Sequence, residues 1–257
     1  MKAATQCRIT HKDGVLHVLI DRAQKRNALS SAILGELRSI FTAHAGDDGL
    51  RFAVLTSAGD KCFAAGGDIH ELESVKGTDA AAAMATESKA ALSAIRSFPV
   101  PVIAGLNGDA LGGGAELSVA CDMRLAATHV RIGFIQGRLA IATAWGGGVD
   151  LMRLVGRARA LQLLCRSEMV SVPQALEYGL INDAAVDGET LDEVLDRFTA
   201  PMLKQAPQVM RAFKALHLHQ NRVGRDELDA LETLRFSETW AHPDHNASVE
   251  RLLTPTE

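Results

Sequence analysis

Up to about residue 190, the apolar residues of this chain fall into short segments. Some segments have the spacing of strands and others have the spacing of helices, and the two kinds alternate along the chain. Short apolar runs bounded by turn residues predict strands at 7–10, 15–20, 52–56, 100–106, 124–127, 130–134 and 184–186. Amphipathic or alanine-rich runs predict helices at 31–45, 78–98, 116–121, 145–155 and 157–165, with a further short helix beside Pro173. Because strands and helices alternate, the pattern favours an α/β fold.

The C-terminal part of the chain differs from the rest, because only helical patterns follow Leu191. Three prolines are predicted to break these helices, at positions 201, 207 and 243. We therefore divide the chain into a core at residues 1–195, which carries binding and catalysis, and a helical region at residues 196–257. The apolar faces of appended helices need a surface to cover. A neighbouring subunit would supply that surface, so the helical region is predicted to serve in oligomerisation.

Composition and charge are those of a globular protein and exclude several classes of function. Of the 257 residues, 47% are hydrophobic and 23% are charged, which is typical of a folded domain. The net charge of -4 provides no electrostatic attraction to nucleic acid or to an anionic membrane. No apolar run approaches the ~20 residues of a membrane helix. We therefore expect neither nucleic acid nor a membrane as a partner.

The four cysteines and nine histidines lack the spacing of disulfide or metal motifs. The cysteines are scattered without a CxxC pair, and the N-terminus lacks the basic and apolar regions of a secretory signal. His217 and His219 are two residues apart and cannot share one face of a helix. These features predict reduced thiols, no metal site and a cytoplasmic protein.

The segment NGDALGGGAELSVACD, residues 107–122, carries the candidate chemistry. It follows a predicted strand, and its glycines at 112–114 precede the predicted helix that begins near Glu116. Unpaired N–H groups at a helix start, with the helix dipole behind them, bind a negatively charged oxygen. A carboxylate beside such groups suggests proton chemistry next to a carbonyl. The alternatives are tight helix–strand packing or a phosphate loop, although Leu117 breaks the GxGxxG pattern of the latter.

A second glycine turn, Gly66 and Gly67, also precedes a predicted helix start. Two such turns could supply two N–H donors to one oxygen. The polar loop DRAQKRNALS, residues 21–30, carries three cations, Arg22, Lys25 and Arg26. Such cations either stay solvated or bind phosphates.

Taken together, the segments CFAAGGDI and NGDALGGGAELSVACDMRLA resemble the two signature segments of the crotonase, or enoyl-CoA hydratase/isomerase, superfamily. The RNAL loop, LVGRARAL and ALEYGLIN occur in the expected order, and the resemblance extends to about Val186. It implies a spiral of ββα units that binds acyl-CoA thioesters, with no cofactor besides the CoA of the substrate. It also implies a C-terminal trimerisation region and a homotrimer that often pairs into a hexamer.

By this resemblance, the backbone N–H groups of Gly67 and Gly113 bind the thioester oxygen and stabilise an enolate. Each such donor contributes about 3 kcal/mol at the transition state. The resemblance also implies a loop that encloses the adenine and bends the CoA, formed by Ala64, Ala65, Gly66, Asp68 and Ile69. The cations at positions 22, 25 and 26 are implied to bind the CoA phosphates.

Glu116 falls on the first of the two catalytic glutamates of the hydratases, and Gln136 falls on the second. An amide holds a water or a carboxylate by hydrogen bonds but cannot exchange a proton as a carboxyl group does. Gln136 therefore departs from a two-glutamate mechanism. The segments ATAWGGG and TWAHPDHN are instead similar to methyl- and ethylmalonyl-CoA decarboxylases of the superfamily. In that comparison Trp145 lines the acyl pocket, with plain core packing as the alternative.

Our first hypothesis is a lyase that decarboxylates a short 2-alkylmalonyl-CoA through a thioester enolate. Loss of carbon dioxide needs no base, and Glu116 would then deliver a proton or orient the leaving carboxylate. The alternative hypothesis is an enoyl-CoA hydratase that adds water to a 2-enoyl-CoA. A third is a CoA-binding protein without catalytic activity.

Overall fold

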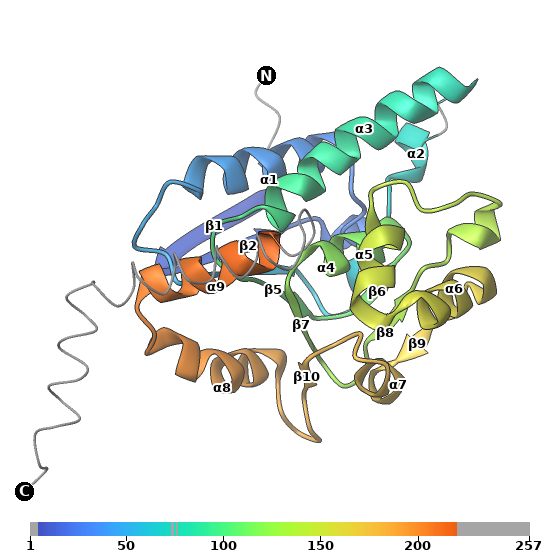
Figure 1. Ribbon diagram of the computed structural model, residues 1–257. Coiled ribbons are helices and arrows are strands. Elements are labelled where there is room, and N and C mark those ends of the chain that lie inside the picture. The colour runs from blue at the N-terminus through green and yellow to red at the C-terminus, as the bar shows by residue number, and fades with distance from the viewer. Residues whose placement is uncertain (1–4, 73–74, 76, 220–257) are drawn as a thin grey trace, which may run out of the picture.

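The computed structural model describes residues 5–72, 75 and 77–219, which are built around two sheets (Figure 1). Within these residues the larger sheet has the order β1-β2-β3-β5-β7-β10, formed by β1 (Cys7–Lys12), β2 (Val15–Ile20), β3 (Phe52–Ser57), β5 (Val102–Leu106), β7 (Met123–Ala126) and β10 (Asp183–Ala184). The smaller sheet has the order β4-β6-β8-β9, formed by β4 (Cys62–Ala64), β6 (Asp109–Leu111), β8 (Arg131–Gly133) and β9 (Val170–Ser171). Only the pairs β1/β2 and β8/β9 are antiparallel among these strands.

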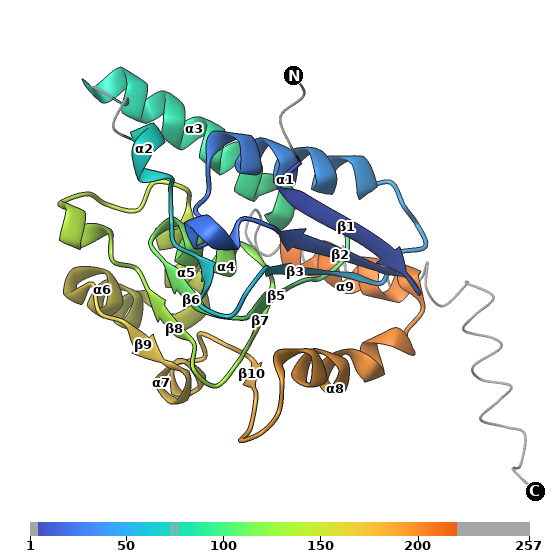
Figure 2. The same cartoon turned by 180° about the vertical axis from the view of Figure 1, so that it is seen from behind.

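Helices cover both faces of the larger sheet. α1 (Ser31–His44) and α3 (Gly77–Arg96) lie side by side on one face, and α8 (Leu191–Leu203) lies on the other (Figure 1 and Figure 2). The described residues also form α2 (Ile69–Leu72), α4 (Gly113–Ala120), α5 (Gly147–Val155), α6 (Arg157–Arg166), α7 (Val172–Glu177), α9 (Pro207–His219) and the 3-10 turns η1 (Ala23–Lys25) and η2 (Gln136–Leu139). α1 begins where the side chain of Ser30 accepts a hydrogen bond from the backbone N–H of Ile33, as the sequence predicts.

Successive pairs of strands build the two sheets, because each pair contributes one strand to each sheet. β3 and β4 are followed by α2 and α3, β5 and β6 by α4, and β7 and β8 by α5 and α6. The first strand of each pair joins the larger sheet and the second joins the smaller one. The chain therefore winds as a spiral of strand–strand–helix units, which agrees with the predicted α/β class.

Two apolar cores lie on opposite faces of the larger sheet. In the first, the rings of Phe41 on α1 and Phe98 meet edge to face with centroids 5.1 Å apart. In the second, Val194 on α8 packs with Ile103 and Leu125. Since β3, β5 and β7 are covered on both faces, their sequences are nearly continuous apolar runs.

Helix α8 belongs to the packed body of the protein. It begins with a capping box, in which Thr190 and Glu193 bond to each other's backbone N–H groups, and it contacts β5, β7 and β10. The predicted boundary at residue 195 falls inside this helix. The predicted break at Pro201 is wrong, because this proline lies in the last turn, where its missing N–H costs a single bond near the helix end. Pro207 begins α9, and Pro243 with residues 220–257 lies outside the described residues.

The two predicted glycine loops each contain a short strand that sequence reasoning missed. β4 and β6 have three residues each, which is too short for an apolar period to be visible. They form because they pair with each other in parallel, Cys62 with Asp109 and Ala64 with Ala110. α4 begins at Gly113 and not at Glu116, so the glycines belong to its first turn.

The first turn of α4 packs against β4 with no space for a side chain at Gly114. A Cβ atom built on Gly114 would overlap the backbone carbonyl of Ala64. Neither backbone can retreat easily, because β4 is paired in the sheet and α4 is buried. Gly35 on α1 provides the contrast, since a Cβ atom there meets nothing within 4 Å.

We predict that Gly114→Ala lowers the free energy of unfolding by about 3 kcal/mol, because overpacking forces the two elements apart. Gly35→Ala is the matched control and should raise it by about 0.5 to 1 kcal/mol, since alanine favours a helix over glycine. Urea denaturation followed by circular dichroism measures both. Equal stabilities of the two variants would contradict the packing described here.

Candidate active site

The two glycine turns lie side by side because the strands that precede them are parallel neighbours. β4 and β6 run in the same direction, so the turns that follow them leave the smaller sheet at the same edge. A Cβ atom built on Gly66, which has a φ of +97°, would lie 3.4 Å from the backbone nitrogen of Gly113 and 3.1 Å from the carbonyl oxygen of Leu111. The structure therefore brings together the two turns that the sequence singled out.

The backbone N–H groups of Gly67 and Gly113 have no backbone acceptor within the described residues. Gly113 is the first residue of α4, where N–H groups have no partner inside the helix. Gly67 forms an isolated parallel β-bridge with Leu29. In this bridge Leu29 N–H donates to the carbonyl of Gly66, and Asp68 N–H donates to the carbonyl of Leu29. The N–H of Gly67 faces away from Leu29 as a result. Both groups are thus available to a ligand oxygen.

Glu116 lies in the first turn of α4 with only 2% of its surface exposed. Its carboxylate accepts four N–H bonds. Oε1 accepts from Gln136 Nε2 at 2.9 Å and from Ala144 N at 3.4 Å, and Oε2 accepts from Trp145 N at 2.8 Å and Gly147 N at 2.9 Å. A buried carboxylate is tolerated when such bonds replace its hydration. The result is a preorganised carboxylate beside the two glycine turns.

Sequence reasoning missed the backbone donors to Glu116, although a signal for them exists in the glycine run at 146–148. Gly146 has a φ of +91°, which glycine adopts without strain, and it turns the chain into α5. A Cβ atom on Gly147 would overlap the side chain of Glu116. These glycines let the start of α5 approach the carboxylate closely.

Arg96, at the end of α3, holds the segment that binds Glu116. It donates from Nη2 to the carbonyl oxygen of Trp145 at 2.8 Å and from Nε to Asp150 Oδ2 at 2.6 Å. Burial raises the pKa of Asp150, while the neighbouring guanidinium of Arg96 acts in the opposite direction. Three helices are therefore linked through Arg96, the segment before α5 and the carboxylate on α4.

The Trp145 ring packs against both glycine turns. A Cβ atom on Gly113 would overlap the ring, and one on Gly67 would lie 3.6 Å from its Cζ2 atom. Trp145 belongs to the main apolar core and also lines a cavity of about 800 Å³. Its two predicted roles, core packing and lining of a pocket, are thus both compatible with its position.

Gln136 faces Glu116, a point that the sequence alone left open. Its side chain is 8% exposed and donates from Nε2 to the carboxylate. Its Oε1 atom is buried and has no hydrogen-bond partner among the described residues. Buried acceptors are rarely left unpaired. This oxygen is available to an O–H or N–H donor next to Glu116.

The three cations of the loop at 21–30 differ in their surroundings. Arg22 donates to Asp68 Oδ2 at 2.7 Å and to the carbonyl oxygen of Ala28 at 3.0 Å. The hydrogen bond from Arg22 lowers the pKa of Asp68. These two predicted ligand residues are therefore engaged with each other, whereas Lys25 and Arg26 are exposed and remain the candidates for phosphate binding.

Asn27 is a structural residue of the site that sequence reasoning did not identify. It is buried with a φ of +52°, and its side-chain Nδ2 donates to Ser57 Oγ, Ala58 O and Cys62 O. Its Oδ1 accepts from the backbone N–H of Arg22. Asn27 thereby fastens the cationic loop to the strands that lead to the first glycine turn.

The loop that is predicted to enclose the adenine connects β4 to α2. Ala64 ends β4, the N–H of Ala65 donates to the carbonyl of Arg26 at 3.1 Å, and Ile69 begins α2. The contact of this loop with adenine stays a prediction.

Burial raises the pKa of the nearby Cys62 thiol to about 11, so this cysteine stays protonated near neutral pH and does not act as a nucleophile.

A cavity of about 800 Å³ adjoins the site. It begins at Gly67 and Trp145 and continues between α1 and α3. Its volume falls in the range of small-molecule pockets. Its apolar lining includes Leu34, Leu72, Met84 and Ala91.

Known proteins resemble this chain in sequence and in fold. The chain matches the family model described as Enoyl-CoA hydratase/isomerase over residues 10–253. It is 34% identical to a probable enoyl-CoA hydratase of Bacillus subtilis, with 94% of this chain and 93% of that protein covered. It is 32% identical to a crotonyl-CoA hydratase of Syntrophomonas wolfei, with 95% and 94% covered. The crystal structure of an enoyl-CoA hydratase from Bacillus anthracis superposes with a TM-score of 0.90 at 28% identity, over 96% of each chain.

The family match spans nearly the whole chain and agrees with the paired glycine turns and the buried carboxylate. The names of these relatives refer to hydration and give no support to the decarboxylase-like subtype that we expected. No helix of the described residues is long and apolar enough to span a bilayer. The chain belongs to the enoyl-CoA hydratase/isomerase family of enzymes that act on acyl-CoA thioesters.

Proposed function

We propose that the protein is an enoyl-CoA hydratase, which adds water across the double bond of a 2-enoyl-CoA thioester. The observation that carries this proposal is the buried Glu116 carboxylate, held by four N–H groups beside the free amides of Gly67 and Gly113. Hydration needs a base for water and a site for the developing enolate oxygen. This arrangement supplies both. The hydratase names of the relatives in Bacillus subtilis and Syntrophomonas wolfei support the same reaction.

In the reaction, the thioester oxygen accepts hydrogen bonds from Gly67 N and Gly113 N. Water donates one hydrogen bond to Glu116 and the other to the unpaired Oε1 of Gln136. Glu116 takes a proton from the water as its oxygen bonds to the β-carbon, and the double-bond electrons move onto the thioester oxygen. Each amide stabilises that oxyanion by about 3 kcal/mol. The enolate then collapses, and Glu116 returns the proton to the α-carbon.

Gln136 serves as a positioning residue in this scheme, since an amide neither gains nor loses a proton near neutral pH. A single carboxyl group therefore performs both proton transfers. The hydroxyl group and the proton therefore add to the same face of the double bond, because Glu116 is both the base and the later acid.

Decarboxylation, the reaction we first expected, fits the charges of the site less well. A malonyl thioester would bring a second carboxylate close to Glu116, and two like charges in a buried site repel each other. A cation would be needed to bind the second carboxylate of the malonyl group. Two arginines of the described site, Arg22 and Arg96, are already paired with Asp68 and Asp150.

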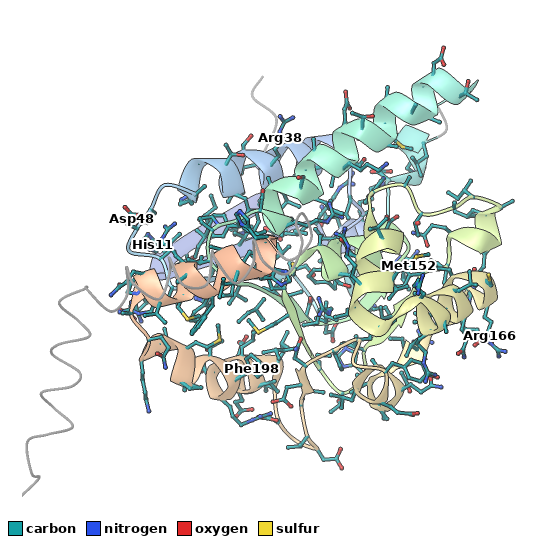
Figure 3. The ribbon with its side chains drawn as sticks, in the orientation of Figure 1. His11, Arg38, Asp48, Met152, Arg166 and Phe198 are labelled. Atoms are coloured by element: carbon teal, nitrogen blue, oxygen red, sulfur yellow. The ribbon has the colours of Figure 1, made fainter. Side chains whose placement is uncertain are left out.

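Substrate and assembly follow the family in this proposal. Exposed Lys25 and Arg26 bind the CoA phosphates. The enzyme is a homotrimer or hexamer, and one surface for subunit contact is formed by exposed apolar residues on η2, on the segment that follows it, and on α5 and α6. Its residues are Leu139, Ile141, Val149, Met152 and Leu161, and Figure 3 labels Met152 on α5. The cytoplasmic location stays a prediction.

We predict that the purified protein converts crotonyl-CoA into a product heavier by one water and leaves methylmalonyl-CoA unchanged. A mass-spectrometric time course with each thioester in a separate tube measures this. Loss of carbon dioxide from methylmalonyl-CoA, with crotonyl-CoA untouched, would refute hydration and restore the decarboxylase hypothesis.

We predict that Glu116→Gln lowers kcat for hydration by about 10²-fold to 10⁴-fold, the range for removal of a general base. The dissociation constant of butyryl-CoA should change little, because the glycine amides and the loop cations remain. Glu177→Gln, at an exposed glutamate of α7, is the matched control and should retain full activity. Hydration at the wild-type rate by Glu116→Gln would show that another group is the base.

A further inference from the structure

The cavity between α1 and α3 is an extension of the proposed site, because its inner end is formed by Gly67 and Trp145. Gly67 supplies one of the two amides that bind the thioester oxygen in the proposed function. An acyl chain on that thioester would therefore start beside the cavity. We propose that this cavity, named here the α1–α3 channel, binds long uncharged acyl chains and that such 2-enoyl-CoA thioesters are the preferred substrates. This inference rests on the proposed function.

Six of the ten residues that line the channel on the two facing helices are glycine, alanine or serine, which leaves space between the helices. On α1 the lining is Ser31, Leu34, Gly35 and Arg38, and on α3 it is Ala80, Ala83, Met84, Glu87, Ser88 and Ala91. These positions recur at spacings of three and four residues, so they form one stripe on each helix. Helices in contact normally lie close enough for larger side chains to fill the space between them. Small side chains here leave that space open.

The length of the channel exceeds what a crotonyl group requires. Its lining on α3 runs from Ala80 to Ala91, which corresponds to roughly 16 Å along the helix. A cavity of about 800 Å³ would hold mostly water around a four-carbon acyl group. Each additional methylene displaces water from apolar surface and so strengthens binding.

The chemistry of the lining favours a chain without charge. Leu34, Ser88, Ala91 and Trp145 are buried and form the floor. Three charged residues of the lining, Arg38, Glu71 and Glu87, are exposed at the rim, and Figure 3 shows Arg38 on α1 at the outer edge of the molecule. The fourth, Asp68, is buried and paired with Arg22. The floor residues carry no charge that could pair with a carboxylate. An acyl chain with a terminal carboxylate would lose its hydration there without compensation.

Binding of saturated thioesters tests the channel without turnover. By isothermal titration calorimetry, we expect affinity to rise from butyryl-CoA to decanoyl-CoA by about fourfold for each buried methylene. Glutaryl-CoA should bind no better than pentanoyl-CoA. Equal affinities for butyryl-CoA and decanoyl-CoA, or tighter binding of glutaryl-CoA, would overturn the proposal.

Neighbouring alanines on α3 provide a matched pair of variants. Ala83 lines the channel and Ala82 does not, and both are exposed positions where leucine is nearly as favourable to the helix as alanine. Ala83→Leu should weaken decanoyl-CoA binding about tenfold or more and leave butyryl-CoA binding unchanged. Ala82→Leu should change neither. Equal effects of the two variants on decanoyl-CoA would overturn the assignment.

A second variant distinguishes a filled channel from a misfolded protein. The Cβ position of Gly35 is open, so Gly35→Leu should place its side chain in the channel from the α1 side without a clash. It should weaken decanoyl-CoA binding as Ala83→Leu does, while thermal stability is retained. Decanoyl-CoA binding at wild-type strength in this stable variant would count against the channel.

Hydration assays with crotonyl-CoA and 2-decenoyl-CoA separate the two proposals. A higher kcat/KM for 2-decenoyl-CoA supports both. If neither thioester is hydrated but decanoyl-CoA still binds more tightly than butyryl-CoA, hydration is refuted and the channel stands. If crotonyl-CoA is hydrated and chain length has no effect on binding, the channel is refuted and hydration stands.

Discussion

The parallel pairing of β4 with β6 is the constraint on which the site depends. These strands have only three residues each, yet they place two glycine turns at one edge of the smaller sheet. Gly114 rests against the backbone of Ala64 without space for a methyl group, so α4 cannot shift along the strand. Glycine costs conformational entropy on folding. That cost is offset by a fixed geometry in which the two glycine turns lie side by side.

A buried carboxylate connects this edge to the rest of the protein. Burying the charge of Glu116 would be strongly unfavourable without compensation. Compensation comes from Gln136 and from backbone N–H groups just before α5, and Arg96 at the end of α3 holds the same segment through the Trp145 carbonyl. The hydrogen bonds therefore fasten three helices to the point where the proposed base sits. Stability of the fold and orientation of the base have the same physical origin.

The two ends of the proposed ligand site differ in character. Beside Glu116 the groups are polar and fixed, and the buried Oε1 of Gln136 has no partner among the described residues. Beyond Trp145 the space between α1 and α3 is wide because alanine, serine and glycine face each other there. In the proposed reaction, backbone amides and one carboxylate act on the thioester, and the size of side chains on two helices is proposed to select the acyl group. The Trp145 ring, packed on both glycine turns, separates the two parts.

The sequence by itself determined the elements with a strong local pattern. The strands β2, β3 and β5, the helices α1 and α3, the two glycine turns and the position of Glu116 at a helix start all follow from apolar spacing and turn residues. It did not determine β4 and β6, the continuation of α8 through Pro201, the donors to Glu116 or the pairing of Arg22 with Asp68. Apolar spacing records which side of a segment is buried, whereas these features, apart from the continuation of α8, join residues 20 or more positions apart, as with Gln136 and Glu116. Such contacts arise only when separate segments pack together, and the tertiary structure decided them.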